Sequence, residues 1–118
     1  MREYVALQRF QPYVERGNFL PARLGVEVVD TCEANDLMVL GIEGFLFDGG
    51  YVVPQMKLIG DFSPQSPNIS WRADRRASNE WARDFASPLV GRHELFLDFV
   101  VTCEDDLRAL DRERKSKQ

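Results

Sequence analysis

The chain has 118 residues, 44% of them hydrophobic, which suits one domain with its own core and excludes global disorder. Its formal net charge of −4 argues against a broad surface for nucleic acid or anionic membrane. No apolar run approaches the roughly 18 residues that a spanning helix needs, and the N-terminus lacks the apolar stretch of a signal peptide. We therefore expect a single cytoplasmic domain over residues 1–118, with residues 112–118 frayed.

Two elements are predicted in the N-terminal part of the chain. The apolar spacing of residues 1–17 predicts a helix that Pro12 kinks or restarts and that Gly17 ends. Residues 24–30 alternate valine with glutamate, and this period of two predicts a half-buried strand. The chain is therefore expected to begin with a helix that leads into a sheet.

A hairpin is the clearest local prediction. Residues 36–47 are almost continuously apolar, as in a central strand, and their two glycines indicate a bulge or bend. Asp48-Gly49 between two apolar runs is a strong hairpin signal, and residues 51–59 form the return strand. Pro54 lacks a backbone donor, so this return strand is expected at an edge or with a bulge.

The second half begins with a loop and a helix. Residues 60–68 are rich in Gly, Pro, Ser and Asn, which predicts a loop. A helix is predicted within residues 69–88, capped by Ser70 or Asp74. Three apolar residues at helical spacing are expected to line its buried face: Ala77, Trp81 and Phe85.

A strand and a helix complete the chain. Residues 93–101 alternate apolar side chains on one face, which predicts a strand. Thr102 is expected to cap a following helix, whose first turn is acidic, and Glu104 should pair with Arg108 one turn later. The acidic cluster at residues 104–106 therefore has a structural explanation, and we predict no metal site there.

Reactive residues are few. Cys32 and Cys103 are expected to remain thiols in a reducing compartment, and Cys103 is interpreted as an inert thiol on the strand face, the alternative being a nucleophile at a helix N-terminus. The single histidine, His93, is predicted to lie exposed in a turn. No spacing typical of a zinc site or a phosphate-binding loop is present, so we predict neither a metal nor a cofactor.

The segment 71–83 combines two tryptophans with four arginines. Trp and Arg are enriched in protein interfaces, and arginine beside an aromatic ring also suits nucleic acid. The alternative is an amphipathic helix with Trp81 in the core and a solvated Arg/Glu face. We predict a partner-binding set made of Trp71, Arg72, Arg75, Arg76, Glu80 and Arg83.

The order of elements predicts an α+β fold, a two-layer sandwich whose mostly antiparallel sheet of about four strands carries helices on one face. The alternative is a small curved sheet wrapped around the N-terminal helix. No catalytic set is recognised, so we predict a non-enzymatic protein-binding domain of the inhibitor, immunity, anti-defence or chaperone type.

Two other functions remain open at this point. A structural or assembly subunit, such as a phage-tail component or a homo-oligomer, would use the edge strand that Pro54 indicates. An enzyme would need a carboxylate from Glu43, Asp48 or Asp61 beside His93. Nucleic-acid and membrane partners are not expected.

Overall fold

Four strands form one antiparallel sheet in the computed structural model, which describes residues 4–64 and 70–116. The sheet order is β1-β4-β2-β3. In chain order the elements, with η for 3₁₀ helices, are η1 (Val5–Tyr13), β1 (Leu20–Pro21), η2 (Ala22–Leu24), α1 (Gly25–Ala34), β2 (Met38–Asp48), β3 (Tyr51–Asp61), α2 (Trp71–Ala86), η3 (Ser87–Leu89), β4 (Leu95–Thr102) and α3 (Glu104–Ser116).

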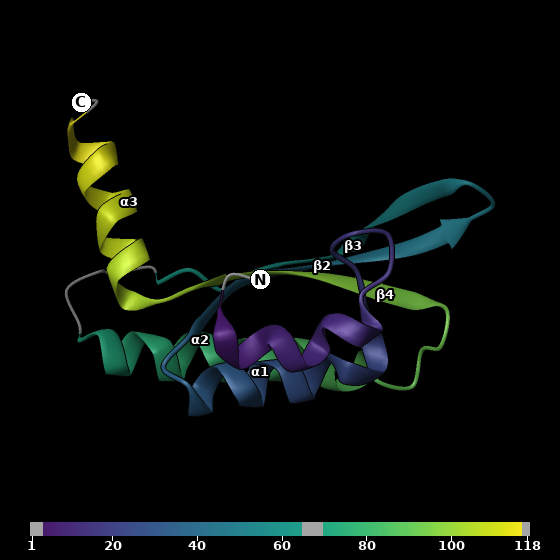
Figure 1. Cartoon of the computed structure of the whole chain (residues 1–118), viewed down its shortest axis with the longest axis horizontal. Coiled ribbons are helices and arrows are strands. Elements are labelled where there is room, and N and C mark those ends of the chain that lie inside the picture. Colours follow the sequence, from purple (N-terminus) through teal and green to yellow (C-terminus); the bar gives the residue numbers. More distant parts are fainter. Residues whose placement is uncertain (1–3, 65–69, 117–118) are drawn as a thin grey trace.

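The helices η1, α1 and α2 lie together on one side of the sheet, and α3 rises on the other side from one end (Figure 1). The predicted α+β architecture is therefore confirmed. The core lies between the sheet and the helical layer. Its largest fully buried side chains are Phe10, Phe62, Leu7, Leu20, Met38, Ile42, Leu95 and Leu97.

The predicted hairpin is confirmed, but its turn lies one residue later than expected. Asp48 pairs with Tyr51, so Gly49 and Gly50 form the two-residue loop. Gly49 has a φ of 59°, and glycine adopts this left-handed conformation without a Cβ clash. A positive φ at the first loop position is what a type II′ hairpin turn requires.

β3 is an edge strand, as Pro54 predicted. Backbone nitrogens along an antiparallel strand point alternately toward the paired strand and away from it. Tyr51 pairs with Asp48, so the nitrogen of Pro54, three residues later, points to the free edge, where no ladder hydrogen bond is lost. The predicted bulges are also present, because the register of β2 shifts between Val39 and Gly41 and between Glu43 and Phe45.

The strand predicted over residues 24–30 is wrong, because Gly25–Ala34 is the helix α1. Its buried residues are Gly25, Val28, Val29 and Cys32, the i, i+3, i+4, i+7 spacing of a helix. The short alternation of valines is compatible with the period of a strand and with that of a helix. The longer apolar pattern, which continues to Cys32, fits only the helix.

The buried face of α2 also differs from the prediction. Ala77 and Trp81 are exposed and Phe85 is half-buried, whereas the core side carries Ser78, Asn79, Ala82 and Ala86. These small side chains let α2 approach α1 and the sheet closely. The predicted cap is confirmed, since the Ser70 hydroxyl accepts a hydrogen bond from the Ala73 amide at 3.2 Å.

β4 confirms its predicted face, because Leu95, Leu97 and Phe99 are buried. The predicted cap at Thr102 is wrong. α3 begins only at Glu104, and the Thr102 hydroxyl donates to the carbonyl of Cys103 instead. The predicted ion pair between Glu104 and Arg108 is present. The loop predicted over residues 60–68 lies partly outside the described residues, and β3 extends into it as far as Asp61.

Close packing at Gly44 gives a first prediction. A Cβ there would lie 2.9 Å from Leu58 Cβ, so Gly44→Ala should lower the free energy of unfolding by about 1–3 kcal/mol through overpacking. At Gly50 an added Cβ meets no atom within 4 Å, and Gly50→Ala should change it by less than about 1 kcal/mol. Urea denaturation measures both variants, and equal losses would contradict the packing argument.

Candidate protein-binding surfaces

A polar junction fixes α2 against α1. The guanidinium of Arg75 is only 15% exposed and makes two hydrogen bonds to the Glu33 carboxylate, at 3.1 Å and 3.2 Å. A further guanidinium nitrogen bonds Asp36. This bidentate geometry is the strong form of an arginine–carboxylate contact, so Arg75 serves the fold rather than a partner.

Asn79 completes this junction from the buried side of α2. Its amide nitrogen donates to Glu33 Oε1 and to the carbonyl of Leu37, both at 2.9 Å. Its amide oxygen accepts from the backbone nitrogen of Val39 at 2.8 Å. One buried side chain therefore ties α2 to α1 and to the start of β2.

Two further residues of the predicted partner-binding set also make contacts within the chain. Trp71 donates from Nε1 to Asp36 Oδ1 at 2.7 Å, and Arg83 pairs with Asp30 of α1 at 3.0 Å. The hydrogen bond from Trp71, followed by that from Arg75, lowers the pKa of Asp36. These contacts leave the set divided between helix packing and the surface.

The remaining residues form an exposed surface on α2. Arg72, Arg76 and Glu80 lie one turn apart, and neither arginine forms an ion pair with a described carboxylate. We name this surface the α2 outer face and define it by Arg72, Ala73, Arg76, Ala77, Glu80 and Trp81.

Trp81 is the aromatic residue of the α2 outer face and lies at its end. Its side chain is 51% exposed, and its ring meets the buried Phe62 edge-on with centroids 5.5 Å apart. The interpretation that placed Trp81 in the core is therefore wrong. The signal that could have located it was the run of small residues Ser78, Ala82 and Ala86, which mark the packed side of α2.

A second surface lies on the side of the sheet opposite η1, α1 and α2 (Figure 1). Side chains alternate across the sheet, so these are the residues between the buried ones. We name it the second sheet face and define it by Glu43, Phe45, Phe47, Ile59, Phe96, Asp98 and Val100.

One end of the second sheet face is aromatic. The rings of Phe47 and Phe96 stack with centroids 4.2 Å apart, and Phe19 packs edge-on against Phe45 and Phe47. The Arg16 guanidinium lies 4.6 Å from the Phe47 centroid and donates to the hairpin-loop carbonyls. The rings are half-buried, so this end is covered by the chain itself.

The middle of the second sheet face is more exposed and is acidic. Glu43 and Asp98 are directly opposite each other on β2 and β4. Burial raises the pKa of Asp98, and the neighbouring charge of Glu43 raises it further. No lysine or arginine side chain among the described residues pairs with either carboxylate. Ile59 is 47% exposed beside them and Val100 is 55% exposed.

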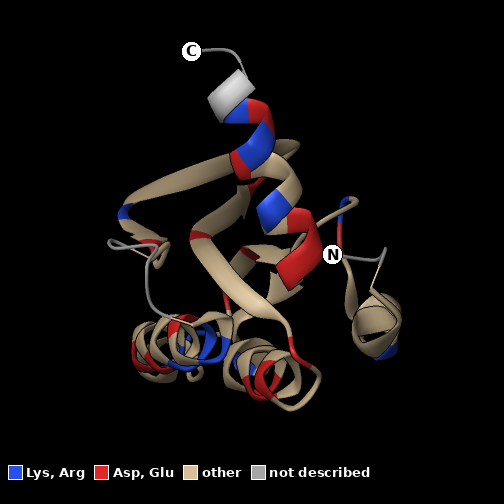
Figure 2. Ribbon diagram, turned by 90° about the vertical axis from the view of Figure 1, so that its left-hand side faces the viewer, with Lys and Arg blue, Asp and Glu red and all other residues tan. Residues whose placement is uncertain are grey.

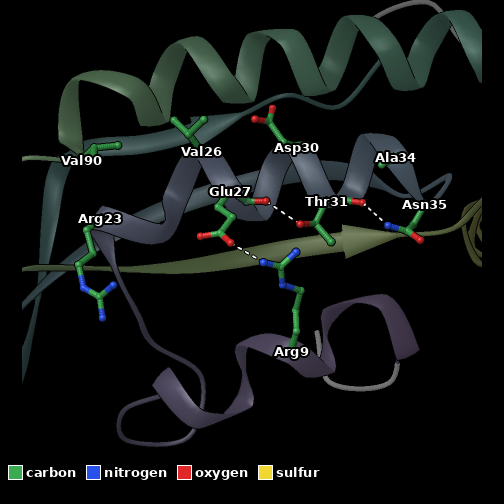
Figure 3. A pocket seen from close by; sticks show the side chains of 9 residues that line it. All are labelled: Arg9, Arg23, Val26, Glu27, Asp30, Thr31, Ala34, Asn35 and Val90. Atoms are coloured by element: carbon green, nitrogen blue, oxygen red, sulfur yellow. Dashed lines mark hydrogen bonds and ion pairs between the residues drawn. The ribbon is translucent and has the colours of Figure 1, made fainter.

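An open pocket of about 540 Å³ lies between η1 and α1 (Figure 3). Arg9 reaches across it to Glu27, and the hydroxyl of Thr31 donates to the Glu27 carbonyl. Asn35 in turn donates to the carbonyl of Thr31. Its polar groups mostly satisfy one another and none is a nucleophile or a histidine, so the pocket offers no reactive set.

The carboxylates considered for an enzyme are dispersed. Asp48 and Asp61 close opposite ends of the hairpin, and Asp61 pairs with Gly41, seven residues before Asp48 on β2, which is about 23 Å along an extended strand. Asp61 accepts a hydrogen bond from the Ser63 amide, and His93 lies exposed in the turn before β4. The described residues contain no group of three or more His, Cys, Asp or Glu side chains arranged for a metal ion.

Both cysteines are free thiols. Cys32 is buried, and burial raises its pKa to about 12, so it is not a thiolate at neutral pH. Cys103 is half-buried at the start of α3.

Comparison with known proteins adds no functional assignment. No family model matches the chain, and no curated protein matches it significantly in sequence. No helix within the described ranges is both long and apolar enough to cross a membrane.

The junction around Asn79 gives a stability prediction. Asn79→Ala would leave the Leu37 carbonyl and the Val39 amide buried without their partner, so the free energy of unfolding should fall by about 2–4 kcal/mol. Asn35→Ala makes the same change at an exposed side chain and should cost less than about 1 kcal/mol. Urea denaturation compares the two, and a similar loss would contradict the role of Asn79.

The same junction predicts how stability varies with pH. Burial alone would raise the pKa of Glu33, but hydrogen bonds from Arg75 and Asn79 outweigh it and lower the pKa below the ordinary value of 4.5. A lowered folded-state pKa contributes stability above pH 4.5 that is lost as the pH falls through the folded value.

Glu33→Gln should therefore be less stable than the wild type at pH 7, and this difference should shrink as the pH falls toward 3. Chemical denaturation at a series of pH values measures the difference. Asn35→Ala, which removes no ionisable group, should show no such trend. A pH-independent gap for Glu33→Gln would refute the assignment.

Proposed function

We propose that this protein is a non-enzymatic cytoplasmic domain that acts by binding another protein through the α2 outer face. Inhibitors, immunity proteins, anti-defence proteins and chaperones act in this way. The observation that carries the proposal is the exposure of Trp81. The fold buries the polar residues Ser78 and Asn79 of α2 and leaves Trp81, one of the two tryptophans of this helix, half in solvent. Tryptophan and arginine are both typical residues of interface hot spots, and the α2 outer face carries both.

The chemistry of this surface supports one kind of protein partner. The indole of Trp81 is supported edge-on by Phe62, so it is held in place before binding. Ala73 and Ala77 precede Trp81 at one-turn spacing. Their small side chains would let an apolar pocket of the partner approach this side of the helix closely. Arg72 and Arg76 lie beside this stripe, and neither forms an ion pair with a described carboxylate. We therefore expect a protein that presents an apolar pocket bordered by Asp or Glu.

The test begins with capture from the native cell. The tagged chain should retain one stoichiometric protein, whose affinity is then measured with purified components by calorimetry. Trp81→Ala should weaken binding about 30-fold or more, as for a hot-spot residue, and Arg72→Glu with Arg76→Glu should weaken it further by charge repulsion.

Trp81→Ala also removes the contact with Phe62, so folding of each variant is checked by thermal denaturation. The two arginine changes lie at exposed positions and leave the contact between Trp81 and Phe62 intact, so they test the site independently. Tyr51→Ala, at an exposed aromatic residue on the far hairpin, is the matched control and should leave affinity unchanged. A partner that binds all variants equally, or a nucleic acid captured instead of a protein, would overturn the proposal.

A further inference from the structure

α3 stands apart from the helical layer. It rises from the end of β4 on the side of the second sheet face, away from η1, α1 and α2 (Figure 1). Its thirteen residues extend about 20 Å at the helical rise. It is joined to the N-terminal segment by a hydrogen bond of 2.6 Å from the Tyr4 hydroxyl to Asp106.

One side of α3 carries two leucines, with Asp111 and a terminal arginine beside them. Leu107, Leu110 and Arg114 follow at i, i+3 and i+7, which places them on one face of the helix. Leu110 is 41% exposed and Arg114 is exposed. Acidic residues fill the first turn of α3, and basic and acidic residues alternate further along it (Figure 2).

The second sheet face has the complementary properties. Val100 and Ile59 expose apolar surface, and Glu43 and Asp98 add two carboxylates that no described lysine or arginine side chain neutralises. Exposed apolar side chains beside two carboxylates would be covered well by a leucine-bearing helix that also carries arginine. α3 has this composition.

We propose that two copies of the chain associate with the α3 helix of each copy lying across the second sheet face of the other. Leu107 and Leu110 of one copy would cover Val100 and Ile59 of its partner. Arg114 would approach the carboxylates of Glu43 and Asp98.

Both halves of the contact belong to one chain, so a two-fold axis makes the contact twice. Because the surface and its complement lie on the same chain, two copies can associate without another protein. α2 lies on the opposite side of the sheet (Figure 1), so the α2 outer face would stay exposed in both copies. This inference is therefore independent of the proposed partner-binding function.

The experiment is light scattering coupled to size exclusion, with sedimentation equilibrium to obtain the dissociation constant. The wild type should change from a mass of 13.6 kDa to twice that value as its concentration rises. Leu110→Ser, Glu43→Arg and Arg114→Glu should each weaken the dimer about tenfold or more. The double variant with Glu43→Arg and Arg114→Glu restores opposite charges and should recover most of this loss.

The altered residues are exposed, so circular dichroism should show an unchanged fold in each variant. Arg72→Glu makes the same charge change as Arg114→Glu, but on the α2 outer face, and should leave dimerisation unchanged while weakening partner binding. A monomer at every concentration would overturn the inference. So would a dimer that none of the three single variants weakens, or charge reversals that the double variant does not rescue.

Discussion

The structure depends on one buried side chain, Asn79, whose amide nitrogen and amide oxygen both form hydrogen bonds. It bonds the carbonyl of Leu37 and the amide of Val39, and thereby holds α2 beside the start of β2. Leaving such backbone groups unpaired in the interior costs more than their hydrogen bonds contribute, so the requirement is strict. It fixes the rotation of α2 about its own axis. Once Asn79 points inward, Trp81, two residues further along the helix, must lie toward the surface.

This constraint explains why the hairpin and β4 could be predicted from the sequence, whereas the orientation of α2 could not. Alternation and a glycine turn are local signals, and they located β2, β3 and β4 to within a few residues. The Leu37 carbonyl that Asn79 bonds lies 42 positions away in the sequence. A hydrophobicity scale also predicts that Trp81 is buried and that Asn79 is exposed. The polar junction therefore prevailed over the apolar pattern.

α1 is a second element that local sequence signals could not predict. Its valines favour a strand by local propensity, but the packed layer needs Val28, Val29 and Cys32 on one side of a helix. The candidate site was foreseen in part for a similar reason. Arginines can be located from sequence, but only the structure shows that Arg75 and Arg83 are used to hold α1, while Arg72 and Arg76 remain exposed.

The two proposed surfaces follow from a single asymmetry of the fold. The helical layer covers one side of the sheet, and its outer surface presents α2, while the other side is left to the second sheet face and α3. A dimer through the latter would carry two α2 outer faces directed away from each other. If the binding partner is itself dimeric or repetitive, both faces could engage it, and avidity would exceed the affinity of one face without any new contact. A partner with a single site would gain nothing, so the dependence of binding on partner valency would show whether dimerisation serves recognition or only the stability of α3.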